Sequence, residues 1–210
     1  MTKPYRLADS TLAREIEAAT AADLVSYAHS ARSSGIYPDT EVLRVAGGVA
    51  LWFCPDNVVN GSFGLGMNGV VEQEEIAALI AFLEERGAPG STNVCPLADP
   101  SLLRWLAHYR FVPSGFEAVL HQPLPAAVIA QPAPGVEVRI ATTAEERELW
   151  AVLEARGFKN DDVSDPDMVL ARALSLRPDA LCFIGYLDGE PAGTGMLVMT
   201  DGIALFNGDS

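Results

Sequence analysis

The most regular pattern of hydrophobic and polar positions lies at residues 72–86, where aliphatic side chains return every three or four residues. The spacing i, i+3, i+4, i+7 places four of them on one side of a helix: Ile76, Leu79, Ile80 and Leu83. This pattern predicts an amphipathic helix that packs one face against a core. Gly87 follows directly and is expected to end the helix, because glycine readily takes the left-handed conformation of a C-terminal cap.

Other helices are predicted where a capping residue precedes apolar positions. Asp9 and Ser10 can begin a first helix, and the Thr-Ala-Ala-Asp segment 20–23 is typical of a second helix start, so two helices are expected before Gly35. Asp99 followed by Pro100 predicts a helix over 100–109, because Asp caps helices and Pro fits their first turn.

Two helices are predicted in the last third of the chain. Thr143 and Glu146 form a capping box, and the helix that follows is expected to run to about Arg156 and to end at Gly157. Asp165-Pro166 begins the next helix, which is expected to end near residue 177. The side chains expected to face inward on these two helices are Leu149, Val152, Leu153, Val169, Leu170, Ala173 and Leu174.

Strands are predicted where short apolar and β-branched segments lie between turn residues. In the first part of the chain, residues 41–54 are expected to form either a strand pair, 42–45 and 49–53 joined by Gly47-Gly48, or one bent strand. Further strands are expected at 58–67, 91–96 and 115–121. In the second part they are 136–140, 181–187, 191–199 and 203–206. Asp188-Gly189 and Asp201-Gly202 separate the last three, and such dipeptides favour tight hairpin turns.

Residues 122–135 contain four prolines and end in Gly135. Proline removes a backbone donor and clashes with the preceding helical turn, so this segment is predicted to be a linker. It divides the chain into a first unit, 1–121, and a second unit, 136–210. The three tryptophans lie in strand or helix patterns and are expected in cores or between the units: Trp52, Trp105 and Trp150.

The formal charge of −14 indicates which partners suit this surface. A strongly acidic chain repels phosphate backbones, so nucleic acid is a poor partner, whereas a cationic amine is favoured. No apolar run is long enough to span a bilayer, and residues 1–6 lack an apolar signal region, so neither a membrane nor secretion is expected.

The cysteines are expected to be free thiols in a reducing cytoplasm, because Cys54, Cys95 and Cys182 are far apart and each lies in an apolar run. The three histidines are isolated from the cysteines and from one another. No spacing of these residues indicates a metal site.

A family resemblance becomes visible at the end of the chain. Residues 186–195 read Tyr-Leu-Asp-Gly-Glu-Pro-Ala-Gly-Thr-Gly, and residues 202–206 read Gly-Ile-Ala-Leu-Phe. This run resembles the central meander of GNAT-type N-acetyltransferases, and the resemblance covers 136–210. It implies an α/β fold, a mixed α+β sheet, and acetyl-CoA as the co-substrate that acetylates an amine.

The first unit also resembles part of this fold, its second half. His108-Tyr109-Arg110-Phe111 lies where the family commonly has a tyrosine and a Gly-Phe pair, with Arg110 in place of the glycine. The resemblance therefore implies a tandem arrangement, in which a degenerate GNAT-like unit precedes the first half of another.

The family's pyrophosphate loop, Gln/Arg-x-x-Gly-x-Gly/Ala, would begin just after Ser210, so the chain is expected to lack the full cofactor site. We expect it to bind acetyl-CoA weakly or not at all. The strand at 203–206 is then expected to pair its free edge with another segment or another molecule, as in a homo-oligomer.

The resemblance implies roles for residues near the end of the fourth strand of the second unit and between its helices. Asn207, Gly208 and Ser210 would lie along the cofactor, and Asp209 is the candidate general base; the alternative for Asp209 is a turn residue. The acceptor amine would meet the loop that follows the first helix of this unit, at Phe158, Asp161 and Asp162. The alternative for that loop is a solvated acidic surface.

A second glycine motif, Gly64-x-Gly66-x-x-Gly69, matches a dinucleotide-binding loop. Acidic residues at 72, 74 and 75 argue against it, because carboxylates repel a pyrophosphate. The main hypothesis is therefore an acetyl-CoA-dependent N-acetyltransferase acting on a small-molecule or peptide amine. A non-catalytic binding or interaction module of the same fold is the alternative, and a dehydrogenase is a third.

Overall fold

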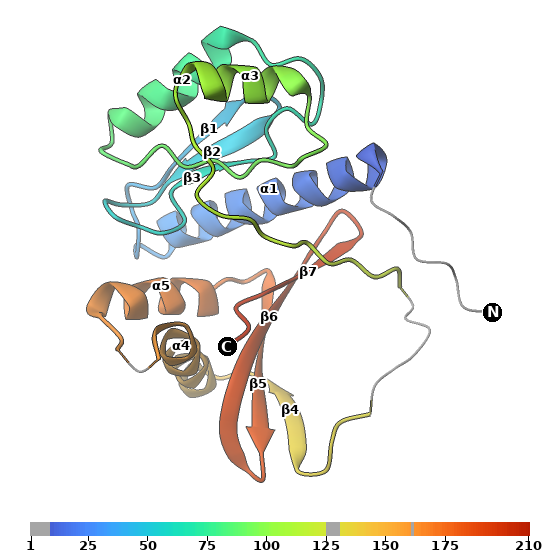
Figure 1. The fold of residues 1–210 in the computed structure, drawn as a ribbon. Helices are drawn as coiled ribbons and strands as arrows, with labels where there is room; N and C mark the ends of the chain where they lie inside the picture. The colour runs from blue at the N-terminus through green and yellow to red at the C-terminus, as the bar shows by residue number, and fades with distance from the viewer. Residues whose placement is uncertain (1–8, 125–130, 161) are drawn as a thin grey trace, which may run out of the picture.

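Two antiparallel sheets carry the fold of this protein, whose computed structural model describes residues 9–124, 131–160 and 162–210 (Figure 1). The sheets have the strand orders β1-β2-β3 and β4-β5-β6-β7. The strands are β1 (Glu41–Val45), β2 (Gly48–Trp52), β3 (Gly61–Phe63), β4 (Val136–Ile140), β5 (Ala180–Leu187), β6 (Glu190–Thr200) and β7 (Ile203–Asn207). The helices are α1 (Ser10–Ser33), α2 (Gln73–Glu84), α3 (Pro100–His108), α4 (Ala144–Lys159) and α5 (Asp165–Ser175).

The three-stranded sheet has helices on both faces, with α1 on one side and α2 and α3 on the other (Figure 1). Consequently β2 is buried on both faces, and its side chains alternate between two cores. Ala50 belongs to the core beneath α2 and α3, whereas Val49 and Leu51 pack with Tyr27 of α1. The predicted helices at 72–86 and 100–109 are confirmed as α2 and α3.

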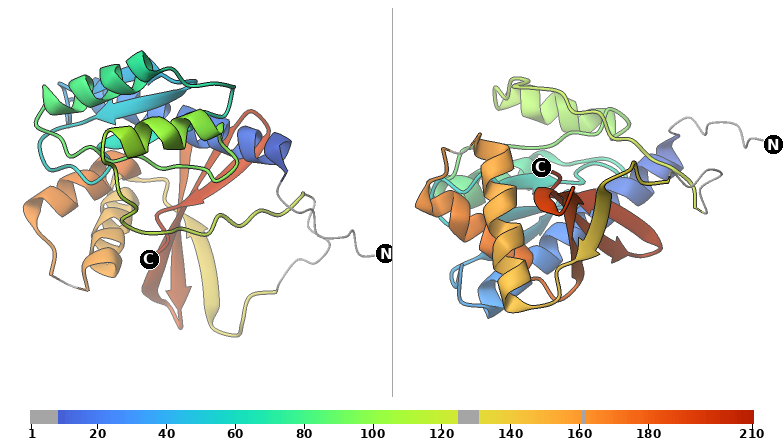
Figure 2. Two further views of the ribbon diagram at one scale, coloured as in Figure 1. Left: turned by 45° about the horizontal axis from the view of Figure 1, so that its top comes forward. Right: turned by 90° about the horizontal axis from the view of Figure 1, so that it is seen from below.

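The four-stranded sheet has α4 and α5 on one face (Figures 1 and 2). Its strands follow one another as antiparallel neighbours, with pairs such as Val138–Gly185 and Leu197–Phe206. This is the meander predicted from the segments 136–140, 181–187, 191–199 and 203–206, and it is confirmed.

The outer edge of β7 forms no strand pairing with the part of the chain that the structure describes. The helix α1 lies beside this strand instead. Pairing with another segment is therefore not found among these residues, and pairing with another molecule stays a prediction.

The N-terminal segment forms one continuous helix of 24 residues, so the prediction of two helices is wrong. The segment 20–23 does not restart the helix, because Asp23 does not act as a cap. Its carboxylate accepts hydrogen bonds from Arg177 and Asn207 in the second unit. The Asp23 side chain, which the sequence indicated as a helix cap, instead forms a tertiary contact.

Three predicted strands of the first unit are shorter or missing. The strand at 58–67 contracts to β3, and 91–96 contributes one bridge, between Thr92 and Ser62. Residues 115–121 form no strand, and their large apolar side chains Phe116 and Leu120 are 96% and 92% exposed. Their apolar pattern is not enough, since a strand also needs a neighbour for its backbone groups.

The helix α4 does not end at Gly157 but continues to Lys159 and closes at Asn160, which takes the left-handed conformation. Gly157 serves a close contact instead: a Cβ there would lie 2.3 Å from the Cβ of Ser210. The last residues of the chain thus rest between α4 and β6. Thr194 fixes them by donating its amide to the carbonyl oxygen of Ser210, at 2.9 Å.

The inward faces of α4 and α5 also differ from the prediction. The most buried residues of α4 are Trp150, Ala151, Glu154 and Ala155. Leu149 and Leu153 are partly buried and pack against this core as predicted, whereas Val152 is partly buried and does not belong to it. On α5, Val169 faces outward, and Leu170, Ala173 and Leu174 reach the core as expected. Trp150 is the largest fully buried side chain of α4 and packs in the second core.

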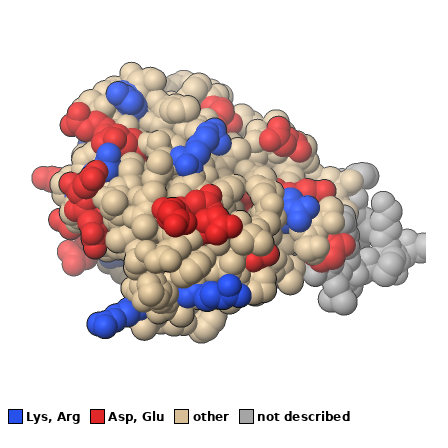
Figure 3. Space-filling model, turned by 90° about the horizontal axis from the view of Figure 1, so that it is seen from above, with Lys and Arg blue, Asp and Glu red and all other residues tan. Residues whose placement is uncertain are grey.

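The described parts of the segment 122–135 contain no helix or strand, and residues 125–130 lie outside the described residues; the division into two units by a linker stays a prediction. No helix in the described ranges is long and apolar enough to cross a membrane. On the face that carries α2 and α3, acidic side chains gather at one side and in the centre, with basic side chains between them (Figure 3).

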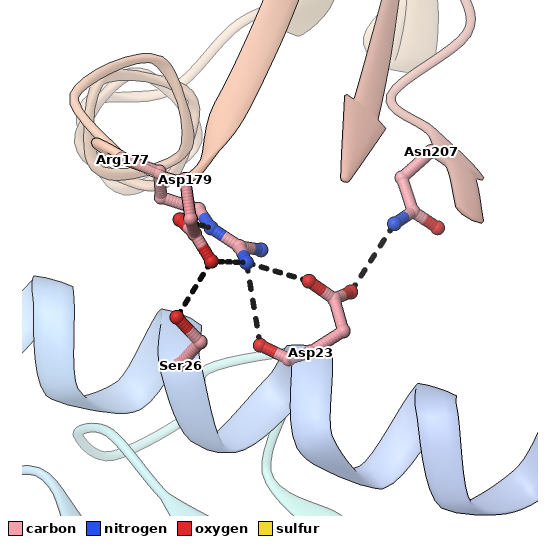
Figure 4. Close-up of polar contacts among 5 residues, drawn as sticks. All are labelled: Asp23, Ser26, Arg177, Asp179 and Asn207. Atoms are coloured by element: carbon pink, nitrogen blue, oxygen red, sulfur yellow. Dashed lines mark hydrogen bonds and ion pairs between the residues drawn. The ribbon is translucent and has the colours of Figure 1, made fainter. Parts of the chain in front are cut away.

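The two units meet through a shared core and a buried ion pair. Ala173 of α5 packs in the same cluster as Tyr27 and Ala28 of α1. Beside it, Nη2 of Arg177 lies 2.5 Å from Oδ1 of Asp23, and the Arg177 side chain is 1% exposed (Figure 4). The same guanidinium binds Asp179, whose carboxylate accepts a hydrogen bond from Ser26 of α1 at 2.6 Å.

Removing this cation should be costly, because Asp23 would remain buried without its partner. We expect Arg177→Met to lower the free energy of unfolding by about 3–5 kcal/mol in urea denaturation. Arg172→Met is the matched control: Arg172 forms a similar pair with Glu148, but both side chains are about half exposed, so its loss should be below about 1 kcal/mol. Equal losses for the two variants would contradict the prediction.

Candidate functional site

A cavity of about 430 Å3 lies where the two units meet, and both units contribute to its wall. The first unit provides α1 and the loop that precedes β3, and the second provides α4, α5, β6 and the end of β7. The lining residues are Asp23, Leu24, Tyr27, Val58, Val59, Glu154, Ala155, Phe158, Lys159, Asp167, Leu170, Leu174, Arg177, Met196, Asn207 and Gly208. Its size and mostly apolar wall are typical of small-molecule sites.

Glu154 is the buried carboxylate of this cavity. It lies one helical turn after Trp150 on α4, on the face turned toward the core, and is 7% exposed. None of the described residues forms a hydrogen bond or ion pair with its carboxylate. Burial raises the pKa of Glu154 from its ordinary value of 4.5 to about 7, and the negative charge of Asp167 adds to the shift.

Asp167 has the opposite electrostatic environment. Its pKa is lowered to about 2, first by hydrogen bonds from the hydroxyl and amide of Ser164 and then by Lys159. The Lys159 ammonium lies 3.0 Å from Oδ1 of Asp167. This cation therefore neutralises Asp167 and leaves Glu154 without a positive partner.

Arg177 is likewise engaged, by Asp23 and Asp179 (Figure 4). Each of the two cations in the cavity wall, Lys159 and Arg177, is thus paired with a carboxylate other than Glu154. Two carboxylates with pKa values pushed in opposite directions within one cavity are a common feature of sites that transfer protons.

Tyr27 forms part of the wall contributed by α1. Its ring packs against Phe53, with centroids 4.8 Å apart, and against the guanidinium of Arg177. Burial raises the pKa of this phenol well above its ordinary value, so the hydroxyl stays neutral. The buried hydroxyl has no hydrogen-bond partner among the residues that the structure describes.

Of the residues predicted at the end of β7 for cofactor binding and catalysis, some line this cavity and others do not. Asn207 and Gly208 line it, and the Asn207 amide donates to Asp23 at 3.2 Å (Figure 4). Ser210 and Asp209 are exposed and lie outside the lining. The catalytic role of Asp209 and the cofactor role of Asn207, Gly208 and Ser210 stay predictions.

The residues predicted to meet the acceptor amine also differ in whether they line the cavity. Phe158 lines the cavity and is 59% exposed, as expected for a residue at its rim. Asp162 is exposed and does not line the cavity, and Asp161 lies outside the described residues. Only Phe158 of these three is therefore found at the cavity, and no ligand contact has been tested.

Glu154 was not anticipated from the sequence, although a signal was present. It follows Trp150 by four residues, so the two side chains share one face of a helix. A carboxylate on the same face as a tryptophan expected in a core would have indicated a buried acid.

The glycine motif at 64–69 serves the packing of the first unit. The Gly66 amide donates to Ala46, and a Cβ at Gly66 would lie 3.2 Å from Leu102. Glu75 accepts hydrogen bonds from the amides of Ala46 and Glu72. The Gly66 amide is therefore not available to a phosphate, and the Glu75 carboxylate close by would repel one. The dehydrogenase hypothesis, which rested on this loop, loses its support.

Comparisons with known proteins support the fold. No family model and no curated protein sequence matches this chain. A solved structure described as a GCN5-related N-acetyltransferase from Kribbella flavida is similar, with a TM-score of 0.60 and 16% sequence identity, over 88% of this chain and 71% of that chain. The predicted GNAT-like α/β fold is confirmed, whereas the tandem arrangement stays a prediction.

The pKa of Glu154 leads to a prediction about stability. The folded protein keeps this proton up to about pH 7, whereas an unfolded chain releases it near pH 4.5. Between these values the folded state binds more protons, so the free energy of unfolding falls as the pH rises, by at most about 3 kcal/mol.

Glu154→Gln should remove this decline, because the amide carries no proton to lose. We expect the variant to be more stable than the parent protein at about pH 8 and to gain nothing at about pH 4, as measured by urea denaturation. Glu145→Gln, an exposed position in the first turn of the same helix, is the control. An unchanged pH slope in Glu154→Gln would show that Glu154 is not the titrating group.

Proposed function

We propose that this chain forms the amine-binding part of an acetyl-CoA-dependent N-acetyltransferase, with Glu154 as the general base. One observation carries the proposal: a buried carboxylate that has no partner among the described residues lies in the same cavity as the end of β7. In the GNAT family the pantetheine arm runs along this strand, and a carboxylate on or near it can act as the base. Glu154 meets that description from the neighbouring helix.

The chemistry requires a neutral amine. Glu154 would accept a proton from the bound ammonium, and the freed lone pair would attack the thioester carbonyl carbon. A carbon–nitrogen bond forms, the carbon–sulfur bond breaks, and the coenzyme leaves as a thiolate, which takes up the second proton that the nitrogen loses as the amide forms. A carboxylate with a pKa of about 7 is well matched to neutral pH, because a large fraction of it is ionised there and it is a stronger base than an ordinary carboxylate.

The described residues fit only one end of acetyl-CoA. Asn207 and Gly208, which line the cavity at the end of β7, suit the pantetheine arm and the thioester. For the phosphates, the described ranges contain no matching loop, since the Gly66 amide of the motif at 64–69 is already engaged. The acceptor is a small-molecule or peptide amine, and the free cysteines support a cytoplasmic location.

Loss of the base should lower the rate of acetyl transfer. In the protein encoded by the complete reading frame, we expect Glu154→Gln to reduce kcat/KM by about 10²- to 10⁴-fold for an accepted amine. The parent activity should rise with pH through about 7 as Glu154 ionises, and this limb should disappear in the variant. Transfer is measured by release of the free coenzyme thiol.

Two further variants make this experiment decisive. Glu145→Gln should leave the rate unchanged, since this side chain is exposed on the same helix. Asp209→Asn tests the competing base. A large loss in Asp209→Asn together with full activity in Glu154→Gln would overturn the assignment, and amine binding without any transfer would favour the non-catalytic module.

Residues 1–210 alone should bind acetyl-CoA weakly or not at all, because the described residues supply no phosphate cradle. Isothermal titration of acetyl-CoA against this chain measures the affinity. A dissociation constant in the micromolar range would contradict this expectation and would require a phosphate site elsewhere on the chain.

A further inference from the structure

We infer that the cavity selects a small primary amine with one positive charge and an apolar body, and that the first unit supplies the surface that recognises the body. The inference rests on the proposed function only in placing the amine beside Glu154. It narrows the acceptor from any amine to an arylalkylamine or alkylamine.

The charges around Glu154 set the charge of the ligand. From α1 come Asp23 and the neutral Tyr27, from α4 Lys159, from α5 Asp167, and from the segment after α5 Arg177. Both cations are paired with aspartates, as described above. Three carboxylates (Asp23, Glu154 and Asp167) and two cations line the cavity, so its wall carries one excess negative charge, and Glu154 is the lining carboxylate that has no cation among the described residues. A single ammonium group on a ligand would neutralise that charge.

The same arrangement disfavours ligands that carry a carboxylate. An amino acid would bring a second, negative charge into a wall whose cations Lys159 and Arg177 are already engaged. Separating Arg177 from Asp23 to receive it would leave a buried carboxylate unpaired, which costs several kcal/mol. Amino acids and acidic peptides should therefore bind poorly.

The wall chemistry sets the body of the ligand. From the first unit it presents Leu24, Tyr27, Val58 and Val59, and from the second it presents Phe158, Leu170, Leu174 and Met196. Apart from the Tyr27 hydroxyl, which has no partner among the described residues, hydroxyl groups on a ligand would find few partners here, because the Asn207 amide nitrogen already bonds to Asp23. Extra ammonium groups would meet Asp23 and Asp167, which are already paired with cations. Polyamines and amino sugars should therefore bind poorly as well.

The geometry also gives the first unit a function. Leu24 and Val59 lie outside the GNAT-like sheet of the second unit, yet they line the same cavity as Glu154 of α4. Selection of the ligand body would then depend on α1 and on the loop before β3, whereas the charged end of the ligand would depend on α4.

The experiment measures amine binding to the 210-residue chain by calorimetry at about pH 8, without acetyl-CoA, where Glu154 is ionised and alkylammonium groups remain charged. The probes are phenethylamine and hexylamine, compared with phenethyl alcohol, phenylalanine and spermidine. We expect both apolar amines to bind, and the three comparison compounds to bind at least about tenfold more weakly, which corresponds to about 1.4 kcal/mol.

Substitutions test which residues contact the apolar body of the ligand and which contact its ammonium group. Leu24→Ala should weaken phenethylamine binding roughly tenfold, because it removes apolar contact from the wall. Val25→Ala is the matched control: the next residue of α1 is also partly buried but does not line the cavity. Glu154→Gln should abolish the preference of phenethylamine over phenethyl alcohol, a change that a general loss of packing would not produce.

The outcomes separate this inference from the proposed function. Selective amine binding without acetyl transfer by the complete protein would retain the inference and overturn the enzyme. Acetyl transfer that prefers amino acids, polyamines or peptide lysines would retain the enzyme and overturn the inference. Failure of both phenethylamine and hexylamine to bind, or equal effects of Leu24→Ala and Val25→Ala, would also overturn it.

Discussion

The buried pair of Arg177 and Asp23 is the interaction on which the arrangement of the two units depends. Asp23 lies near the middle of α1, and Arg177 follows α5, so the pair joins the long first helix to the second unit (Figure 4). A guanidinium that is 1% exposed is stable only while its carboxylates remain in place. Because both residues line the cavity, the contact that joins the units also forms part of the site.

Much of the fold follows from local sequence rules, and the exceptions have physical causes. The helix at 72–86, the capping box at Thr143 and the meander of 181–206 were predictable, since spacing, caps and turns are local properties. The missed features depend on distant partners. Asp23 resembled a helix start and is instead one half of an ion pair, and Gly157 resembled a helix stop and instead makes room for Ser210.

The site was less predictable than the fold. The resemblance to a known family directed attention to the end of β7, where Asn207 and Gly208 do line the cavity. It did not point to Glu154, whose burial was indicated only by its spacing of four residues after Trp150 on the same face of α4. Nor could it reveal that Lys159 and Arg177 are already paired, since those contacts join residues that only the folded chain brings together.

Both units contribute to the cavity wall, so the wall can change in one unit while the other stays the same. Leu24, Val58 and Val59 lie in a part of the chain that contributes nothing to the four-stranded sheet. Substitutions confined to these three residues would change the apolar wall of the cavity and leave Glu154 and the four-stranded sheet in place. The same freedom does not extend to Asp23, which precedes Leu24 on α1, because its carboxylate holds Arg177 and Asn207.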